Sequence, residues 1–170
     1  MICKPGDVFV VRSGDLFSRA ICAVERRDPG GDSTWSHAGV IVGPNGKTIE
    51  SLWTVRYGNI NDYAGCPLLV GRYKHMDDER FKTGMAQILP HLGETYPAYR
   101  IPLMLLGLGR FVHWYKLVCS ELAVSFLDGA CFRDRFSEFE DPFGWTPADV
   151  AKVLERWEGF EVVYKKLRSE

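Results

Sequence analysis

The sequence has no long hydrophobic run and almost no net charge. Its 170 residues carry 21 Lys and Arg against 22 Asp and Glu, a formal net charge of −1. That balance gives no basic surface for nucleic acid or anionic lipid. The N-terminus lacks the apolar core of a signal peptide. No stretch is as long as a membrane span, which needs about 18 apolar residues. We therefore expect a soluble cytoplasmic protein with no integral membrane segment and no nucleic-acid partner.

The sequence also lacks the motifs of several common sites. Its five cysteines are an odd number, irregularly spaced and without a C-x-x-C pair, which is typical of free thiols in a reducing compartment. The glycines form neither a phosphate-binding loop nor a dinucleotide-binding fingerprint. No His, Cys and Glu set shows a recognised zinc-ligand spacing, so a zinc hydrolase is a minor alternative that elemental analysis would detect. The cysteines are Cys3, Cys22, Cys66, Cys119 and Cys131.

What is present is the composition of a folded domain. Apolar residues make up 46% and charged residues 25% of the chain, close to the average of globular proteins. A chain of this length is typical of one domain, so we expect a single domain over residues 1–170. Such a domain buries enough surface to fold without disulfides or a structural metal.

Short apolar runs bounded by turn residues predict an α+β fold with an antiparallel sheet. Helical spacing of apolar residues and capping signals predict the helices. Residues 93–118, rich in Pro, Gly and aromatic residues, give no assignment. The expected strands are 8–12, 35–42, 48–53, 67–73 and an edge strand at 160–165; the expected helices are 16–26, 77–89, 119–130 and 147–157.

One predicted hairpin brings two polar residues together. The Asn-Gly pair in the loop 43–46 is a turn signal, and a four-residue loop there puts Gly39 opposite Glu50. Glu50 is then the diagonal neighbour of His37 on one face of the sheet, with the Cβ atoms roughly 5–8 Å apart. A register that differs by one residue would put the two side chains on opposite faces.

A cysteine begins the helix predicted at 119–130. Cys119 lies three and four residues before Leu122 and Ala123, so it shares their inward face. Backbone N–H groups at a helix N-terminus favour an anion. An ordinary thiol, with a pKa of about 8.5, is mostly protonated at neutral pH, and a helix N-terminus with a nearby imidazolium increases its thiolate fraction. Cys119 is therefore our candidate nucleophile.

The hairpin supplies the partners that such a nucleophile needs. His37 opens a strand, a rigid position for a general base. Its small neighbours Ala38 and Gly39 are expected to leave room for a substrate or for a helix end. Glu50 can orient the imidazole. The three residues would then form a triad of nucleophile, base and orienting acid. Each of these residue types alone is commonly structural, so the hypothesis rests on their conjunction with Cys119.

Several segments in this order also carry a resemblance to a known family. They are Pro5-Gly6-Asp7-Val8, Ser18-Arg19-Ala20-Ile21, Trp35-Ser36-His37-Ala38-Gly39-Val40, Ile49-Glu50-Ser51, Val118-Cys119-Ser120-Glu121-Leu122 and Thr146-Pro147-Ala148-Asp149. In these segments the chain resembles the circularly permuted papain-like cysteine amidases, the YiiX-like branch of the NlpC-type superfamily. The order of His before Glu before Cys is the permuted one. The match spans most of the chain and is weakest over 74–117.

The resemblance implies a fold and an activity. The fold is a small antiparallel sheet or open barrel packed against helices, with the catalytic cysteine at a helix N-terminus. Cys119 would be the nucleophile, His37 the base and Glu50 the residue that orients His37. The activity would be that of a cysteine hydrolase, an amidase or peptidase that forms an acyl-thioester and needs no metal or organic cofactor. Expected substrates are peptides, peptidoglycan fragments or lipid amides.

Two further functions stay open. A thiol acyltransferase on lipid acyl groups would use the same thioester, and the apolar run 101–106 is either its acyl groove or a buried connector. A non-catalytic binding module would have the same fold and no catalytic activity. Geometry separates them: a Cys119 sulfur within about 4 Å of one His37 nitrogen, with Glu50 on the other, favours the enzyme.

Overall fold

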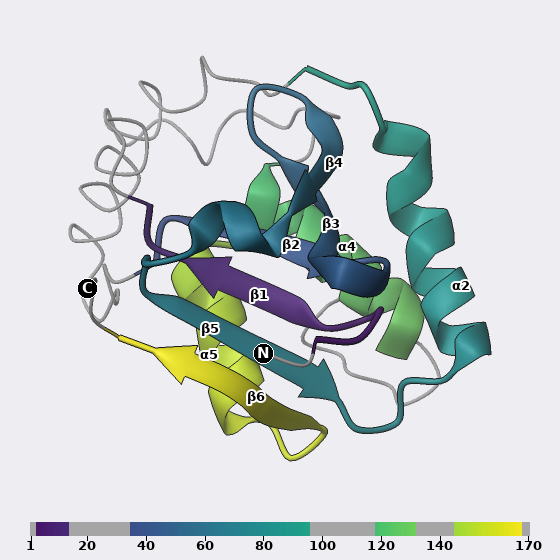
Figure 1. Ribbon diagram of the computed structural model, residues 1–170. Helices are drawn as coiled ribbons and strands as arrows, with labels where there is room; N and C mark the ends of the chain where they lie inside the picture. The colour runs from purple at the N-terminus through teal and green to yellow at the C-terminus, as the bar shows by residue number, and fades with distance from the viewer. Residues whose placement is uncertain (1–2, 14–34, 96–117, 132–144, 168–170) are drawn as a thin grey trace.

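The computed structural model describes residues 3–13, 35–95, 118–131 and 145–167, and the elements below come from these ranges (Figure 1). The strands form one antiparallel sheet in the order β4-β3-β2-β1-β5-β6, so the expected α+β class is confirmed. The strands are β1 (Val8–Val11), β2 (His37–Ile41), β3 (Lys47–Ser51), β4 (Val55–Asn59), β5 (Leu68–Tyr73) and β6 (Phe160–Lys166). The α-helices are α2 (Asp78–Ile88), α4 (Cys119–Cys131) and α5 (Pro147–Arg156).

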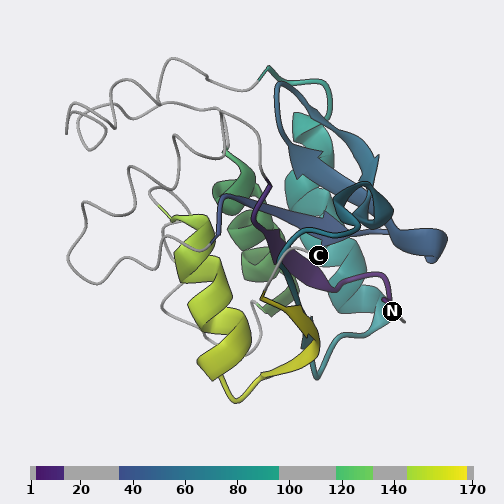
Figure 2. The same ribbon diagram turned by 60° about the vertical axis from the view of Figure 1, so that its left-hand side comes forward.

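One face of the sheet is covered by helices. Successive side chains of a strand point to opposite faces, so every second residue of β1 and β2 contributes to this layer. Helix α4 lies between α2 and α5 against the sheet, as Figures 1 and 2 show from two sides. The buried cluster between the layers includes Val8, Val10, Ala38, Val40, Ile49, Leu122, Ala123, Phe126 and Leu154.

The opposite face carries a second, smaller cluster. Its fully or largely buried members are Phe9, Val11, Ile41, Ile60, Leu68 and Val70. The short 3-10 helix η2 (Ile60–Tyr63) supplies Ile60 to this cluster and packs Tyr63 against it. Alternation along β2 and β3 puts His37 and Glu50 on this same face. The second cluster therefore removes two polar side chains from water.

The hairpin that joins β2 and β3 has the predicted register. Asn45 has φ +59 and Gly46 has φ +76, left-handed conformations that these two residue types tolerate best. The backbone N–H of Val42 donates to the carbonyl of Lys47 at 2.8 Å and closes the loop. Gly39 pairs with Glu50 across the ladder, as expected.

Local capping fixes where α4 and α5 begin. Thr146 and Asp149 form a reciprocal capping box at the start of α5, with Pro147 in its first turn. At the start of α4, the backbone N–H of Val118 donates to the Glu121 carboxylate at 2.9 Å. Because the Ser120 hydroxyl donates to the Trp145 carbonyl at 2.5 Å, the two helix beginnings are tied together.

The structure adds elements that the sequence did not predict, among them η2 and strand β4. Strand β4 follows β3 directly and pairs with it; Val55 and Tyr57 are its only large apolar residues, too short a pattern to predict a strand. The strands expected at 8–12, 67–73 and 160–165 and the helices expected at 77–89, 119–130 and 147–157 are confirmed with small shifts of their ends. The helix expected at 16–26 lies outside the described residues. None of the helices in the described ranges has the length and apolar character to cross a membrane.

Candidate active site

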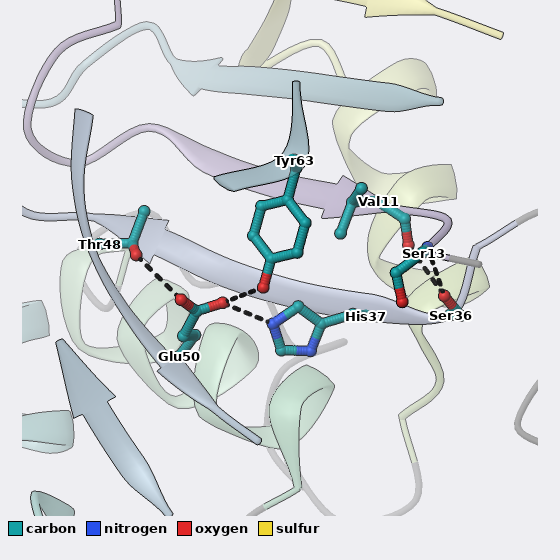
Figure 3. Close-up of polar contacts among 7 residues, drawn as sticks. All are labelled: Val11, Ser13, Ser36, His37, Thr48, Glu50 and Tyr63. Atoms are coloured by element: carbon teal, nitrogen blue, oxygen red, sulfur yellow. Dashed lines mark hydrogen bonds and ion pairs between the residues drawn. The ribbon is translucent and has the colours of Figure 1, made fainter. Parts of the chain in front are cut away.

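His37 and Glu50 are hydrogen-bonded across neighbouring strands. The Nε2–H of His37 donates to Oε2 of Glu50 at 2.8 Å (Figure 3). His37 is 4% exposed and Glu50 1% exposed, so the pair is shielded from water. A carboxylate that accepts from one ring nitrogen fixes the tautomer and the orientation of the imidazole.

The carboxylate of Glu50 is held by further contacts. The Tyr63 hydroxyl donates to Oε2, the oxygen that also accepts from His37, and the Thr48 hydroxyl donates to Oε1 at 3.3 Å (Figure 3). Gly58 of β4 faces the same group, and a Cβ built there would overlap Oε1. Burial by itself raises the pKa of Glu50, but the hydrogen bonds and charges, above all those of His37, lower it overall. Glu50 is therefore ionised and oriented.

Cys119 adds a thiol to this pair. It is the first residue of α4, is 3% exposed, and its thiol lies near enough to His37 to raise the pKa of the imidazole. Since Nε2 of the imidazole is directed to Glu50, Nδ1 is the nitrogen left for the sulfur. The structure thus brings the three predicted residues together in the order thiol, imidazole, carboxylate.

The pKa of His37 reflects these two neighbours. Burial is the largest single influence and acts to lower the pKa. The interactions of His37 with Cys119 and Glu50 outweigh burial and raise the pKa to about 9. The imidazole is therefore protonated at neutral pH.

Aromatic rings surround the imidazole on its face of the sheet. The Phe9 ring meets His37 edge-on with centroids 6.2 Å apart, and the Tyr63 ring lies 5.8 Å away. A Cβ on Gly39 would come within 2.6 Å of the Phe9 ring. The expectation that Gly39 leaves room for a substrate or a helix end is wrong, because Phe9 occupies the space over Gly39. Ala38 lies on the helix-covered face, in one buried cluster with Leu122 and Ala123 of α4.

Tyr63 is the site residue that sequence reasoning missed. It lies in η2, 13 positions beyond Glu50, and reaches the carboxylate only because β4 and η2 fold back over β3. No spacing rule links a 3-10 helix to a strand at that distance. The available signal was weaker: a tyrosine in a polar segment directly after the hairpin.

The other described cysteines occupy different surroundings. Cys3, Cys66 and Cys131 are free thiols, as is Cys119. Burial raises the pKa of Cys131 to about 12, although the Arg80 charge opposes this. Burial, followed by the charge of Asp7, also raises the pKa of Cys3. Cys22 lies outside the described residues.

The remaining histidines and acids do not build a second site of this kind in the described part. His91 bonds Glu94 at 3.1 Å through Nδ1, three residues along a partly exposed turn. The ring of His75 packs against Tyr73. His113 and the apolar run 101–106 lie outside the described residues. Within the described ranges, no three His, Cys, Asp or Glu residues gather closely enough to hold a metal ion.

Comparison with known proteins gives a fold and no family. No family model matches the chain, and no curated protein matches it. Among solved structures, the chain is similar to the crystal structure of the metalloprotein yiiX from Escherichia coli O157:H7, a DUF1105 protein. The two share 16% sequence identity with a TM-score of 0.60, over 96% of this chain and 97% of the other. The chain therefore has a YiiX-like fold.

Proposed function

We propose that the protein is a cysteine hydrolase of the amidase or peptidase type on a permuted papain-like fold. Cys119 is the nucleophile, His37 the general acid and base, and Glu50 the residue that orients His37. The observation that carries the proposal is the hydrogen bond from His37 to Glu50, together with the interaction of the same imidazole with Cys119 at the start of α4. A nucleophile, a base and an orienting group in contact are the minimum set for covalent acyl transfer.

Acylation begins from the thiolate of Cys119 beside the protonated His37. The sulfur attacks the carbonyl carbon of an amide or ester, a C–S bond forms, and the carbonyl electrons move to oxygen. The backbone N–H of Cys119 at the start of α4 is the donor that we assign to this oxyanion, and one such donor is typically worth about 10²–10³ in rate. When the intermediate collapses, the C–N or C–O bond breaks and His37 gives its proton to the leaving group.

Deacylation returns the enzyme to its starting state. The neutral His37 takes a proton from a water molecule, whose oxygen attacks the thioester carbon. The C–S bond breaks, the acid product leaves, and the sulfur keeps the electron pair beside the imidazolium. No oxidant, reductant or metal is needed for this balance.

An acyltransferase would differ only in the acceptor. If an alcohol or amine replaces water in the second half-reaction, the same acyl-thioester transfers its acyl group. The candidate substrates are peptides, peptidoglycan fragments and lipid amides or esters.

The E. coli protein is described as a metalloprotein. In the described part of this chain the donor set does not match a metal site, because no three His, Cys, Asp or Glu residues cluster suitably. Both carboxylate oxygens of Glu50 accept hydrogen bonds, and one ring nitrogen of His37 donates one. We therefore derive no step through a metal.

The experiment that tests the proposal is capture of the acyl-enzyme. The full chain is incubated with activated acyl compounds, namely peptidyl and fatty-acyl p-nitrophenyl esters. A separate sample receives a peptidyl acyloxymethyl ketone, which alkylates a reactive thiol and releases its carboxylate. Intact-mass spectrometry followed by peptide mapping is expected to find the adduct on Cys119. Release of free acid, or of an acylated alcohol when one is added, distinguishes hydrolysis from transfer.

Matched variants give the experiment its controls. Cys119→Ala is expected to lose the adduct and keep its far-UV circular dichroism spectrum. Cys3→Ser removes a half-buried thiol outside the series and is expected to react like the wild type. If no probe acylates Cys119 in the folded wild type, the binding-module alternative replaces the enzyme.

A further inference from the structure

Two donors converge on one oxygen of the buried carboxylate. His37 Nε2 and the Tyr63 hydroxyl both bond Oε2 of Glu50, whereas Oε1 accepts only the longer 3.3 Å bond from Thr48 among the contacts described (Figure 3). The oxygen that faces the imidazole therefore shares its negative charge with a phenol.

The Tyr63 ring is fixed in the position that this bond requires. Its ring centroid lies 5.7 Å from that of Phe9 and 5.8 Å from that of His37, on the face of the sheet that carries the second cluster. Burial, then the charge of Glu50 and its hydrogen bond, raises the pKa of Tyr63 far above its usual value. The phenol is therefore a hydrogen-bond donor throughout the working pH range.

The titratable and charged groups that act on Glu50, His37 and Tyr63 come from four elements. His37 lies on β2, Arg56 on β4, Tyr63 on η2 and Cys119 on α4. Arg56 and His37 stabilise the carboxylate as cations, while Cys119 acts on the imidazole and raises its pKa. Tyr63 is the neutral donor in this set.

We propose that Tyr63 is a positioning residue that limits how strongly Glu50 stabilises the His37 imidazolium, so that His37 can release its proton to the leaving group. This inference rests on the proposed function for its catalytic consequence. A hydrogen bond to a carboxylate oxygen neutralises part of its charge, so loss of the phenol concentrates that charge on His37. A less acidic imidazolium is a poorer general acid.

The test is Tyr63→Phe, which removes the hydroxyl and keeps the ring. Nitrogen-15 NMR titration of the imidazoles, with the His37 signals assigned by their loss in His37→Gln, is expected to show the pKa of His37 rising by roughly half a pH unit. With a probe ester, kcat is expected to fall about 10-fold and KM to change little. A purely structural role would lower the melting temperature without raising the pKa of His37.

Two further changes keep the test decisive. Tyr57→Phe is the control, because that ring is 48% exposed and contacts Lys47 on the surface; it should change neither readout. If Tyr63→Phe does not fold, 3-fluorotyrosine at position 63 provides a more acidic phenol and should lower the pKa of His37 instead.

The outcomes separate this inference from the proposed function. An unchanged or lowered pKa of His37 in folded Tyr63→Phe overturns the role of Tyr63, whatever the activity. A raised pKa in a protein whose Cys119 takes no acyl group supports the coupling of Tyr63 to His37 and overturns the proposed function.

Discussion

His37 and Glu50 lie one diagonal step apart on the β2–β3 hairpin, with Nε2 2.8 Å from Oε2. The turn at 44–46 sets this relationship, because it fixes Gly39 opposite Glu50. A slip of one residue would move Glu50 to the other face of the sheet. The chemistry of the site therefore depends on the register of one hairpin.

Replacing Glu50 with its neutral isostere tests that dependence. Glu50→Gln removes the charge that helps to keep His37 protonated, so the pKa of His37 is expected to fall, and kcat with a probe ester to fall about 10²-fold or more. Nitrogen-15 NMR and steady-state kinetics measure the two effects. Glu94→Gln, which changes the exposed partner of His91, is the matched control and should leave both unchanged. An unaltered His37 titration in Glu50→Gln would contradict our account of the pair.

The free energy of unfolding should decrease at alkaline pH, because His37 loses its proton there. Its pKa in the folded protein, about 9, lies above the ordinary value of 6.5 for histidine. Its interactions therefore stabilise the fold fully below pH 6.5 and are lost as pH rises through about 9. The expected loss of unfolding free energy between pH 6.5 and pH 10 is about 3 kcal/mol, measured by urea denaturation. His37→Gln should flatten this slope. An equal slope in His37→Gln would assign the pH dependence to another group.

The general-acid role gives activity the same alkaline limit. His37 must carry a proton to release the leaving group, so kcat is expected to decline as pH rises through the pKa of His37 in the acyl-forming complex. The pKa of Glu50 is lowered, so its support of His37 is lost only at acidic pH, as the carboxylate becomes protonated. A rate that kept rising above pH 9 would be inconsistent with proton donation by His37.

Gly58 makes room for the carboxylate, and a methyl group there should displace it. A Cβ at Gly58 would overlap Oε1 of Glu50 and approach the Thr48 hydroxyl at 3.0 Å. We expect Gly58→Ala to cost about 1–3 kcal/mol of unfolding free energy and to lower kcat, because the His37 bond is distorted. Gly43→Ala is the control: its φ of −160 is extended and its Cβ would meet only Lys47 at 3.4 Å. A wild-type kcat in Gly58→Ala would contradict the expectation that a methyl group at position 58 displaces the Glu50 carboxylate.

A separate ion pair anchors the sheet away from the site. Arg72 of β5 forms a two-pronged pair with the buried Asp7, at 2.8 and 2.9 Å. Arg72→Met leaves that carboxylate buried without its cation and is expected to cost about 2–4 kcal/mol in urea unfolding. Lys152→Met, which breaks an exposed pair with Asp149, should cost no more than about 0.5 kcal/mol. Equal costs for the two variants would mean that burial of Asp7 does not matter.

Local signals account for the parts of the fold that the sequence predicted. The Asn-Gly turn predicted the hairpin and its register, and the Thr-Pro-Ala-Asp start predicted the capping box of α5. Both are decided within a few residues of chain. The meeting of His37 with Glu50 followed from the same register, since it spans only one turn.

Long-range packing accounts for the parts that were missed. Strand β4 has only Val55 and Tyr57 as large apolar residues, and its hydrogen-bonded pairing with β3 stabilises it as a strand. Gly39 was expected to make room for a ligand, but Phe9 from β1 fills that space. Tyr63 reaches Glu50 only after β4 and η2 fold back. None of these contacts has a signature in neighbouring residues.

The most direct test of the central claim is competition among the five cysteines for an alkylating agent. The native protein is treated with limiting iodoacetamide at pH 6, and peptide mass spectrometry measures how much of each cysteine is modified. A thiolate held beside the His37 imidazolium predicts that Cys119 reacts first, well ahead of Cys3 and Cys131, and that His37→Gln abolishes this preference. Modification of Cys119 no faster than of the other cysteines would contradict the account.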